Sequence, residues 1–104
     1  MSEEEEVEAD RQRALAELYE ADRDKNDKAS LEFRYGPGSF GCHEALHMAN
    51  VILGMMDREL VGHPTILANQ EWYARARKIQ DELYQLYLKM AEVHLVDADR
   101  SSAH

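Results

Sequence analysis

The sequence predicts an all-α protein: an antiparallel helical hairpin, about 41–61 and 66–95, preceded by an N-terminal helix, about 3–24. Two observations predict this fold. All glycines and prolines lie between residues 36 and 64, so the flanking segments contain no helix breaker. In both hairpin segments, apolar residues recur at alternating steps of three and four, the spacing of helices that pack on helices. We expect residues 1–104 to form a single small helical domain.

The N-terminal helix is predicted from its charge and its apolar stripe. Four consecutive glutamates, Glu3 to Glu6, suit the first turn of a helix, where the dipole is positive. A narrow apolar stripe follows at Val7, Ala14, Leu15 and Leu18. We expect residues 1–6 to be a flexible acidic N-terminus, 22–30 a polar connector and 97–104 a polar C-terminal tail. Residues 31–35, LEFRY, alternate apolar and polar, which predicts a short extended piece.

The hairpin is predicted from two heptad-like seams and a short turn. The seam of the first helix consists of Cys42, Leu46, Ala49, Leu53, Met56 and Leu60. Gly62 can end this helix and Pro64 cannot continue it, while Thr65 is the expected N-cap of the next helix. The seam of the second helix consists of Trp72, Ala76, Ile79, Leu83, Leu86, Met90 and Val93. A connection this short makes the two helices antiparallel.

Both hairpin helices carry more apolar surface than one seam uses. The additional rows are Met48, Val51 and Met55 in the first helix and Tyr73, Tyr84, Tyr87 and Ala91 in the second. We expect the N-terminal helix to cover one row and the other to mediate self-association. The simplest assembly is a symmetric dimer that forms a helical bundle. The alternative is a monomer in which the N-terminal helix and residues 31–40 cover both rows.

Charge and cysteine usage limit the classes of function. A formal net charge of −9 argues against a duplex nucleic acid partner, since phosphate binding needs clustered basic residues. An acidic chain can still bind a basic protein surface or mimic nucleic acid. The single cysteine, Cys42, excludes an intramolecular disulfide. The acidic start lacks a secretory signal and no apolar run has membrane-spanning length, so we expect a cytoplasmic protein of a bacterium or phage that does not enter a membrane.

The segment FRYGPGSFGC, residues 33–42, is a glycine-rich turn that leads directly into a helix start. Backbone N–H groups and the positive end of the helix dipole meet there, so the turn is a candidate site for a nucleotide-like anion or for a partner protein. The candidate ligand-binding residues are Arg34 as a bidentate cation, Tyr35 and Phe40 as stacking surfaces, Gly38, Ser39 as a hydroxyl, and His43. The alternative is a turn that folds Phe33, Tyr35 and Phe40 over the end of the hairpin.

The string His43-Glu44-Ala45-Leu46-His47 places two histidines one helical turn apart. It resembles the H-E-x-x-H motif of the zincin metallopeptidases over these five residues. The resemblance implies zinc bound by His43 and His47, with Glu44 as the catalytic base. If the turn centres near residues 62–63, the numbers of facing residues add to about 125, so His43 faces the neighbourhood of Glu82. The candidate third ligand is Glu82, with Asp81 as the alternative. The alternative is a pair of partly buried, hydrogen-bonding histidines.

The sequence favours a non-enzymatic binding module without a cofactor. This module is expected to self-associate and to bind a partner protein or a small anionic ligand through residues 34–43. The second hypothesis is a metal-binding protein or zinc-dependent hydrolase that uses His43, Glu44 and His47. A third is a structural or acidic-mimic role of the surface. Stoichiometric metal, stabilisation by nucleotides, or a salt-sensitive protein complex would distinguish the three.

Overall fold

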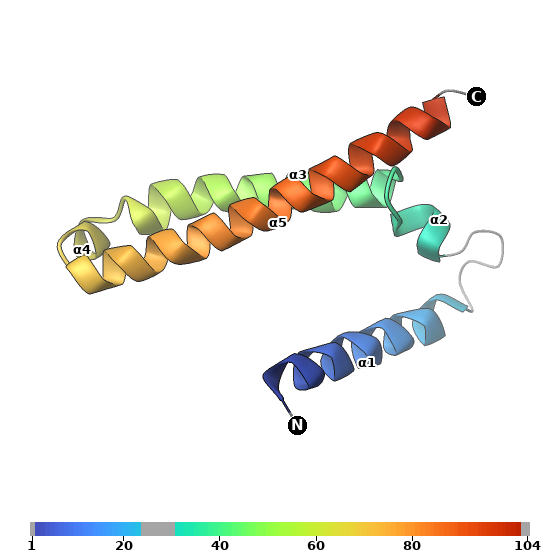
Figure 1. The fold of residues 1–104 in the computed structure, drawn as a ribbon, viewed down its shortest axis with the longest axis horizontal. Coiled ribbons are helices and arrows are strands. Elements are labelled where there is room, and N and C mark those ends of the chain that lie inside the picture. Colours follow the sequence, from blue (N-terminus) through green and yellow to red (C-terminus); the bar gives the residue numbers. More distant parts are fainter. Residues whose placement is uncertain (1, 24–30, 103–104) are drawn as a thin grey trace. The chain divides into compact units, whose positions relative to one another are not determined.

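The computed structural model describes residues 2–23 and 31–102, with side chains described for 2–22 and 31–96. These residues form the helices shown in Figure 1, and the predicted all-α hairpin with an N-terminal helix is confirmed. The chain divides into two compact units, Met1–Arg34 and Tyr35–His104, which are described separately below. Most of the expected connector, residues 24–30, lies outside the described residues. None of the described helices combines the length and apolarity needed to cross a membrane.

The first unit contains helix α1, Glu3–Arg23, and most of helix α2, Leu31–Tyr35. Helix α1 begins as its charge pattern predicts, and the Ser2 hydroxyl accepts a hydrogen bond from the Glu5 N–H at 3.1 Å. The prediction of an extended piece at residues 31–35 is wrong, because this segment is helical. The Tyr19 hydroxyl donates to the Glu32 carboxylate across the two helices. A five-residue alternation is too short to exclude a helix that is held by such contacts.

The second unit is the hairpin. Helix α3, Phe40–Met55, continues into the π-helix η1, Met56–Val61, and helix α5, Gln70–Ser102, returns antiparallel beside them (Figure 1). The N-cap of α3 is Ser39, so the helix begins slightly before the expected residue 41. Helix α5 extends past the expected end at residue 95, into the segment predicted to be a tail.

The turn of the hairpin contains an additional short helix, α4, Pro64–Leu67. The expected N-cap at Thr65 is wrong. The cap is His63, whose Nδ1 accepts a hydrogen bond from the Thr65 N–H at 3.0 Å. Helix α5 starts only after Asn69, whose side-chain oxygen accepts from the Trp72 N–H at 3.0 Å. The connection is therefore longer than predicted, because two capping residues start two helices in succession.

This longer turn shifts the register of the two long helices. Gln80 Nε2 donates to Asp57 Oδ1 at 3.1 Å, and the ring centroids of His43 and His94 lie 5.8 Å apart. In both pairs the residue numbers add to 137, whereas the short turn predicted about 125. The residues that lie opposite the start of α3 are therefore near residue 94, at the far end of α5.

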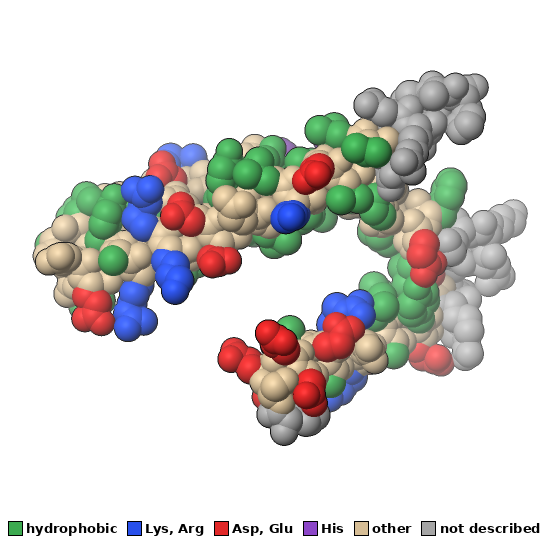
Figure 2. All heavy atoms as spheres, viewed as in Figure 1, with side chains coloured by type: hydrophobic (Ala, Val, Ile, Leu, Met, Phe, Trp, Pro, Cys, Tyr) green, Lys and Arg blue, Asp and Glu red, His purple; other side chains and the backbone are tan. Residues whose placement is uncertain are grey.

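The rotation of α5 also differs from the prediction. Its less exposed positions include Tyr73, Ala76, Gln80, Leu83, Tyr87, Met90 and His94, again at steps of three and four, together with Ala91. This seam shares Ala76, Leu83 and Met90 with the predicted one, but the other predicted members lie outward. The core of the hairpin is thin, since Ala49, Val61 and Ala76 are its buried hydrophobic residues. Hydrophobic side chains accordingly reach the surface over both long helices (Figure 2).

Candidate functional site

A hydrogen bond joins the glycine-rich turn to the C-terminal part of α5. The Gly38 N–H donates to Nδ1 of His94 at 3.0 Å. Gly38 has a φ of 86°, which a residue with a side chain rarely adopts, so glycine is required at this point of the turn. The Ser39 hydroxyl accepts from the Cys42 N–H at 3.1 Å and caps α3. The turn is therefore joined to α5 at Gly38 and to the start of α3 at Ser39.

His94 is the central residue of this arrangement, and it was not among the residues predicted from the sequence. Its imidazole is 6% exposed, and its ring lies tilted by 36° against that of His43. A neutral imidazole nitrogen is an acceptor, and Gly38 supplies the donor that a buried acceptor needs. The available signal was the spacing, because His94 lies four residues after Met90 and three after Ala91 on the inward side of α5.

The other predicted ligand-binding residues are distributed differently. Arg34 belongs to the first unit, where its guanidinium forms an ion pair with Asp22. Tyr35 and Phe40 are exposed, at 56% and 76%. The structure therefore brings Gly38, Ser39 and His43 together around His94.

This arrangement leaves few groups for an anion. The N–H groups of Gly38 and Cys42 already donate to side chains, and the His43 N–H donates to the Ser39 carbonyl oxygen at 3.0 Å. The Ser39 hydroxyl is an N-cap acceptor, which an incoming anion would have to displace. The geometry suits a structural contact that joins the turn to α5, which we call the clasp, better than a phosphate-binding site.

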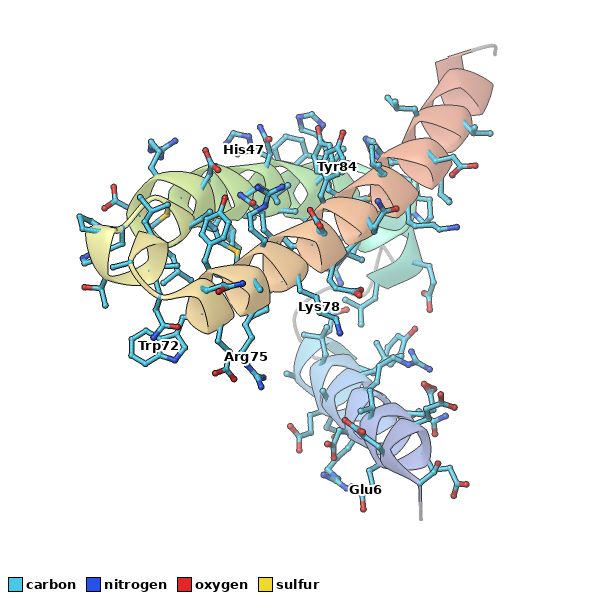
Figure 3. All side chains as sticks on the ribbon, turned by 60° about the vertical axis from the view of Figure 1, so that its left-hand side comes forward. Glu6, His47, Trp72, Arg75, Lys78 and Tyr84 are labelled. Carbon is cyan, nitrogen blue, oxygen red and sulfur yellow. The ribbon has the colours of Figure 1, made fainter. Side chains whose placement is uncertain are left out.

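The histidine pair of the H-E-x-x-H string lies on the outer part of α3. His43, Glu44 and His47 are all exposed, and Figure 3 shows His47 projecting from α3. Glu82 lies twelve positions from His94, the residue that faces His43, which amounts to about 18 Å along the helix axis. The expected ligand set is therefore not brought together. Among the described residues, no group of three or more His, Cys, Asp or Glu side chains could hold a metal ion.

Gly54, in the middle of α3, has a neighbour within its own chain. A Cβ at this position would lie 3.0 Å from Nη1 of Arg58, one turn further along. A glycine inside a helix often indicates that another group approaches its backbone closely, and at Gly54 this group is the flexible guanidinium of Arg58. This part of α3 needs no ligand to explain its glycine.

The second candidate site is an apolar face of the hairpin. We define the apolar face by seven large hydrophobic residues, each between 47% and 58% exposed. They are Met48, Ile52 and Met55 on α3 and Trp72, Ile79, Leu86 and Val93 on α5. Together these side chains present exposed apolar area that another apolar surface could cover.

Helical geometry places both groups of residues on one side of the hairpin. Ile52 lies three positions after the buried Ala49, and Ile79 lies three positions after the buried Ala76. In two antiparallel helices, residues that follow the inward-facing residue by the same number of positions are rotated towards the same face of the hairpin. Figure 3 agrees, since Trp72 and Arg75 project from one side of the hairpin, whereas His47 and Tyr84 project from the other.

The opposite face is mixed, because Tyr84, Leu88 and Leu95 are exposed there beside polar residues. It carries the Asp57–Gln80 hydrogen bond and the exposed His43 and His47. Comparisons of the chain with models of protein families, with curated proteins and with solved structures find no match. The two faces and the clasp at the turn are thus the features on which a function must be based.

Proposed function

We propose that this chain is a non-enzymatic protein-interaction module that binds through the apolar face. The observation that carries the proposal is the row of uncharged large side chains, all about half exposed, on one side of the hairpin. Contiguous exposed apolar surface on a small protein is typical of a binding surface. Covering it removes apolar area from water, at a gain of about 25 cal/mol per Å².

The thin core supports the same proposal. Among the described residues, the hairpin fully buries only small or medium hydrophobic ones and leaves larger ones such as Trp72 and Ile79 about half exposed. A small domain with so thin a core gains stability when a partner covers these side chains. An enzyme needs convergent polar groups in a pocket, whereas the polar groups near the turn are engaged with one another.

The role of the turn in this proposal is to fix the hairpin. The Gly38–His94 hydrogen bond joins the entrance of α3 to the far part of α5, so it keeps the two helices in the register that forms the apolar face. Binding of a small anion at residues 34–43 has less support, because Arg34 and the Gly38 N–H already have partners. We place the module in the cytoplasm of a bacterium or its phage, since Cys42 has no second cysteine to form an intramolecular disulfide.

The proposal is tested by site-specific photo-crosslinking in cells of the source organism. A photoreactive amino acid replaces Ile79 on the apolar face, and a matched variant carries it at Gln85, exposed on the outer side of the same helix. We expect crosslinked protein adducts from position 79 and not from position 85. Equal labelling at both positions, or none at position 79 in correctly folded protein, would contradict the proposal.

A further inference from the structure

We propose that the partner of the apolar face is a second copy of this chain, so that two hairpins stack with two-fold symmetry into a four-helix bundle. This inference rests on the proposed function, because it names the occupant of the same surface. Three observations support it: the double seam of α5, the area of the face and the charges at its edge.

Helix α5 contains two overlapping heptad seams. The first, which includes Tyr73, Gln80 and His94, packs on α3. The second uses the row Trp72, Ile79, Leu86 and Val93. Both seams share Ala76, Leu83 and Met90, which are spaced by seven residues and lie between the two rows. A helix whose shared apolar row has a second row on each side can pack against two neighbouring helices, as in a bundle, whereas the hairpin supplies α5 with one.

The area of the face matches the needs of a dimer. Half-exposed side chains of this size present about 100 Å² each, so the seven residues together present about 700 Å² per copy. Stable protein–protein interfaces bury about 800 Å² per partner. The face together with its charged edge therefore comes close to the area that a specific dimer buries.

The charges along its edge suit a contact between identical copies. Arg75, Glu82 and Lys89 follow one another at seven-residue steps on α5, next to the second seam, with alternating sign. A two-fold axis that lies in the interface and runs across the helices places this edge, antiparallel, against the same edge of the partner. An edge with both signs can pair with itself at a suitable stagger, whereas an edge of one sign would repel its copy. This point matters in a chain whose formal net charge is −9.

The test is the molar mass of the purified full-length protein, measured by light scattering and sedimentation velocity from about 1 to about 100 µM. We expect twice the monomer mass. Leu86→Glu, on the apolar face, is expected to weaken the dimer at least about 30-fold without loss of helical circular dichroism. The matched control is Leu88→Glu, which changes another exposed leucine of the same helix on the other side and should leave the mass unchanged.

The remaining outcomes decide whether the dimer, or the interaction module as well, is overturned. A wild-type monomer at about 100 µM overturns the second copy as the partner. If residue 79 still crosslinks to a different protein in cells, the interaction module survives, and if it does not, both proposals fail. Dimers that resist Leu86→Glu, or that Leu88→Glu dissociates equally, also overturn the inference. If Leu86→Glu unfolds the chain, Ile79→Ser provides the test, because it removes apolar area without adding a charge.

Discussion

Replacing His94 by alanine is expected to lower the free energy of unfolding by about 2–4 kcal/mol. The imidazole is 6% exposed and accepts the Gly38 N–H at 3.0 Å. Leaving that N–H without its partner costs about 1–3 kcal/mol. The lost packing of the ring against the turn and against His43 adds about 1 kcal/mol. The sum is large for one substitution because the ring both fills space and satisfies a donor.

The assay is urea unfolding followed by far-UV circular dichroism, at equal protein concentration because the chain is proposed to dimerise. The matched control is His47→Ala, which removes an exposed imidazole of the other long helix. It should change the free energy of unfolding by at most about 0.5 kcal/mol. Equal effects of the two substitutions would refute the assignment of His94 as the residue that joins the turn to α5.

Three further predictions concern the turn and the first unit. Gly38→Ala should cost about 1–2 kcal/mol in urea unfolding, since its φ of 86° is strained for a side chain, and a small effect would refute the turn geometry. The hydrogen bond from Arg11 lowers the pKa of Glu8 to about 2, so carboxyl NMR should show Glu8 titrating below the other glutamates, and Arg11→Ala should restore it. Because the pKa of Glu8 is lowered, the stabilisation by the Glu8–Arg11 hydrogen bond is present above the ordinary glutamate range and is lost as the pH falls towards 2. A Glu8 titration that is unchanged in Arg11→Ala would exclude this hydrogen bond. The hydrogen bond to Glu32 raises the pKa of Tyr19, so its stability contribution is present below the ordinary tyrosine pKa and is lost as the pH rises through the raised value. Glu32→Gln should lower that pKa in an ultraviolet titration, and no change would show that the two side chains do not pair.

The helices themselves are readable from the sequence. Glycines and prolines confined to residues 36–64, the glutamates of the first turn and the three-four spacing of apolar residues are local signals, and they predict α1, α3 and α5 correctly. The five residues of α2 were misassigned because its helix depends on partners in α1, such as Tyr19 for Glu32. Contacts between segments that are distant in sequence produce no local hydrophobic periodicity from which a helix could be predicted.

The register and rotation of α5 relative to α3 could not be predicted from local sequence signals. Asn69 and Thr65 are both accepted N-cap types, and starting the second long helix after one or the other changes which residues face each other along the hairpin. Ala76, Leu83 and Met90 belong to both seams, so hydrophobicity favours the seam with Ile79 over the one with Gln80. The structure uses the more polar seam inside the hairpin and leaves the more apolar one outside, which is the physical basis of the proposed dimer.

The candidate site was predicted in part. The turn, Gly38, Ser39 and His43 were singled out from local sequence, but their partner His94 lies 56 residues away from Gly38. The metal hypothesis combined His43 and His47 with Glu82 through the assumed register, and the observed register separates them. An error of a few residues in a turn thus changes every pairing along two long helices.

The most direct measurement of the proposed arrangement is the nuclear Overhauser effect between histidine ring protons in the full-length protein. The ring centroids of His43 and His94 are 5.8 Å apart, so cross-peaks between their ring protons are expected. Isotope-filtered spectra of a mixed sample show whether they arise within one chain. Cross-peaks from His43 to Glu82 side-chain protons, with none to His94, would contradict the register, and with it the apolar face and the dimer.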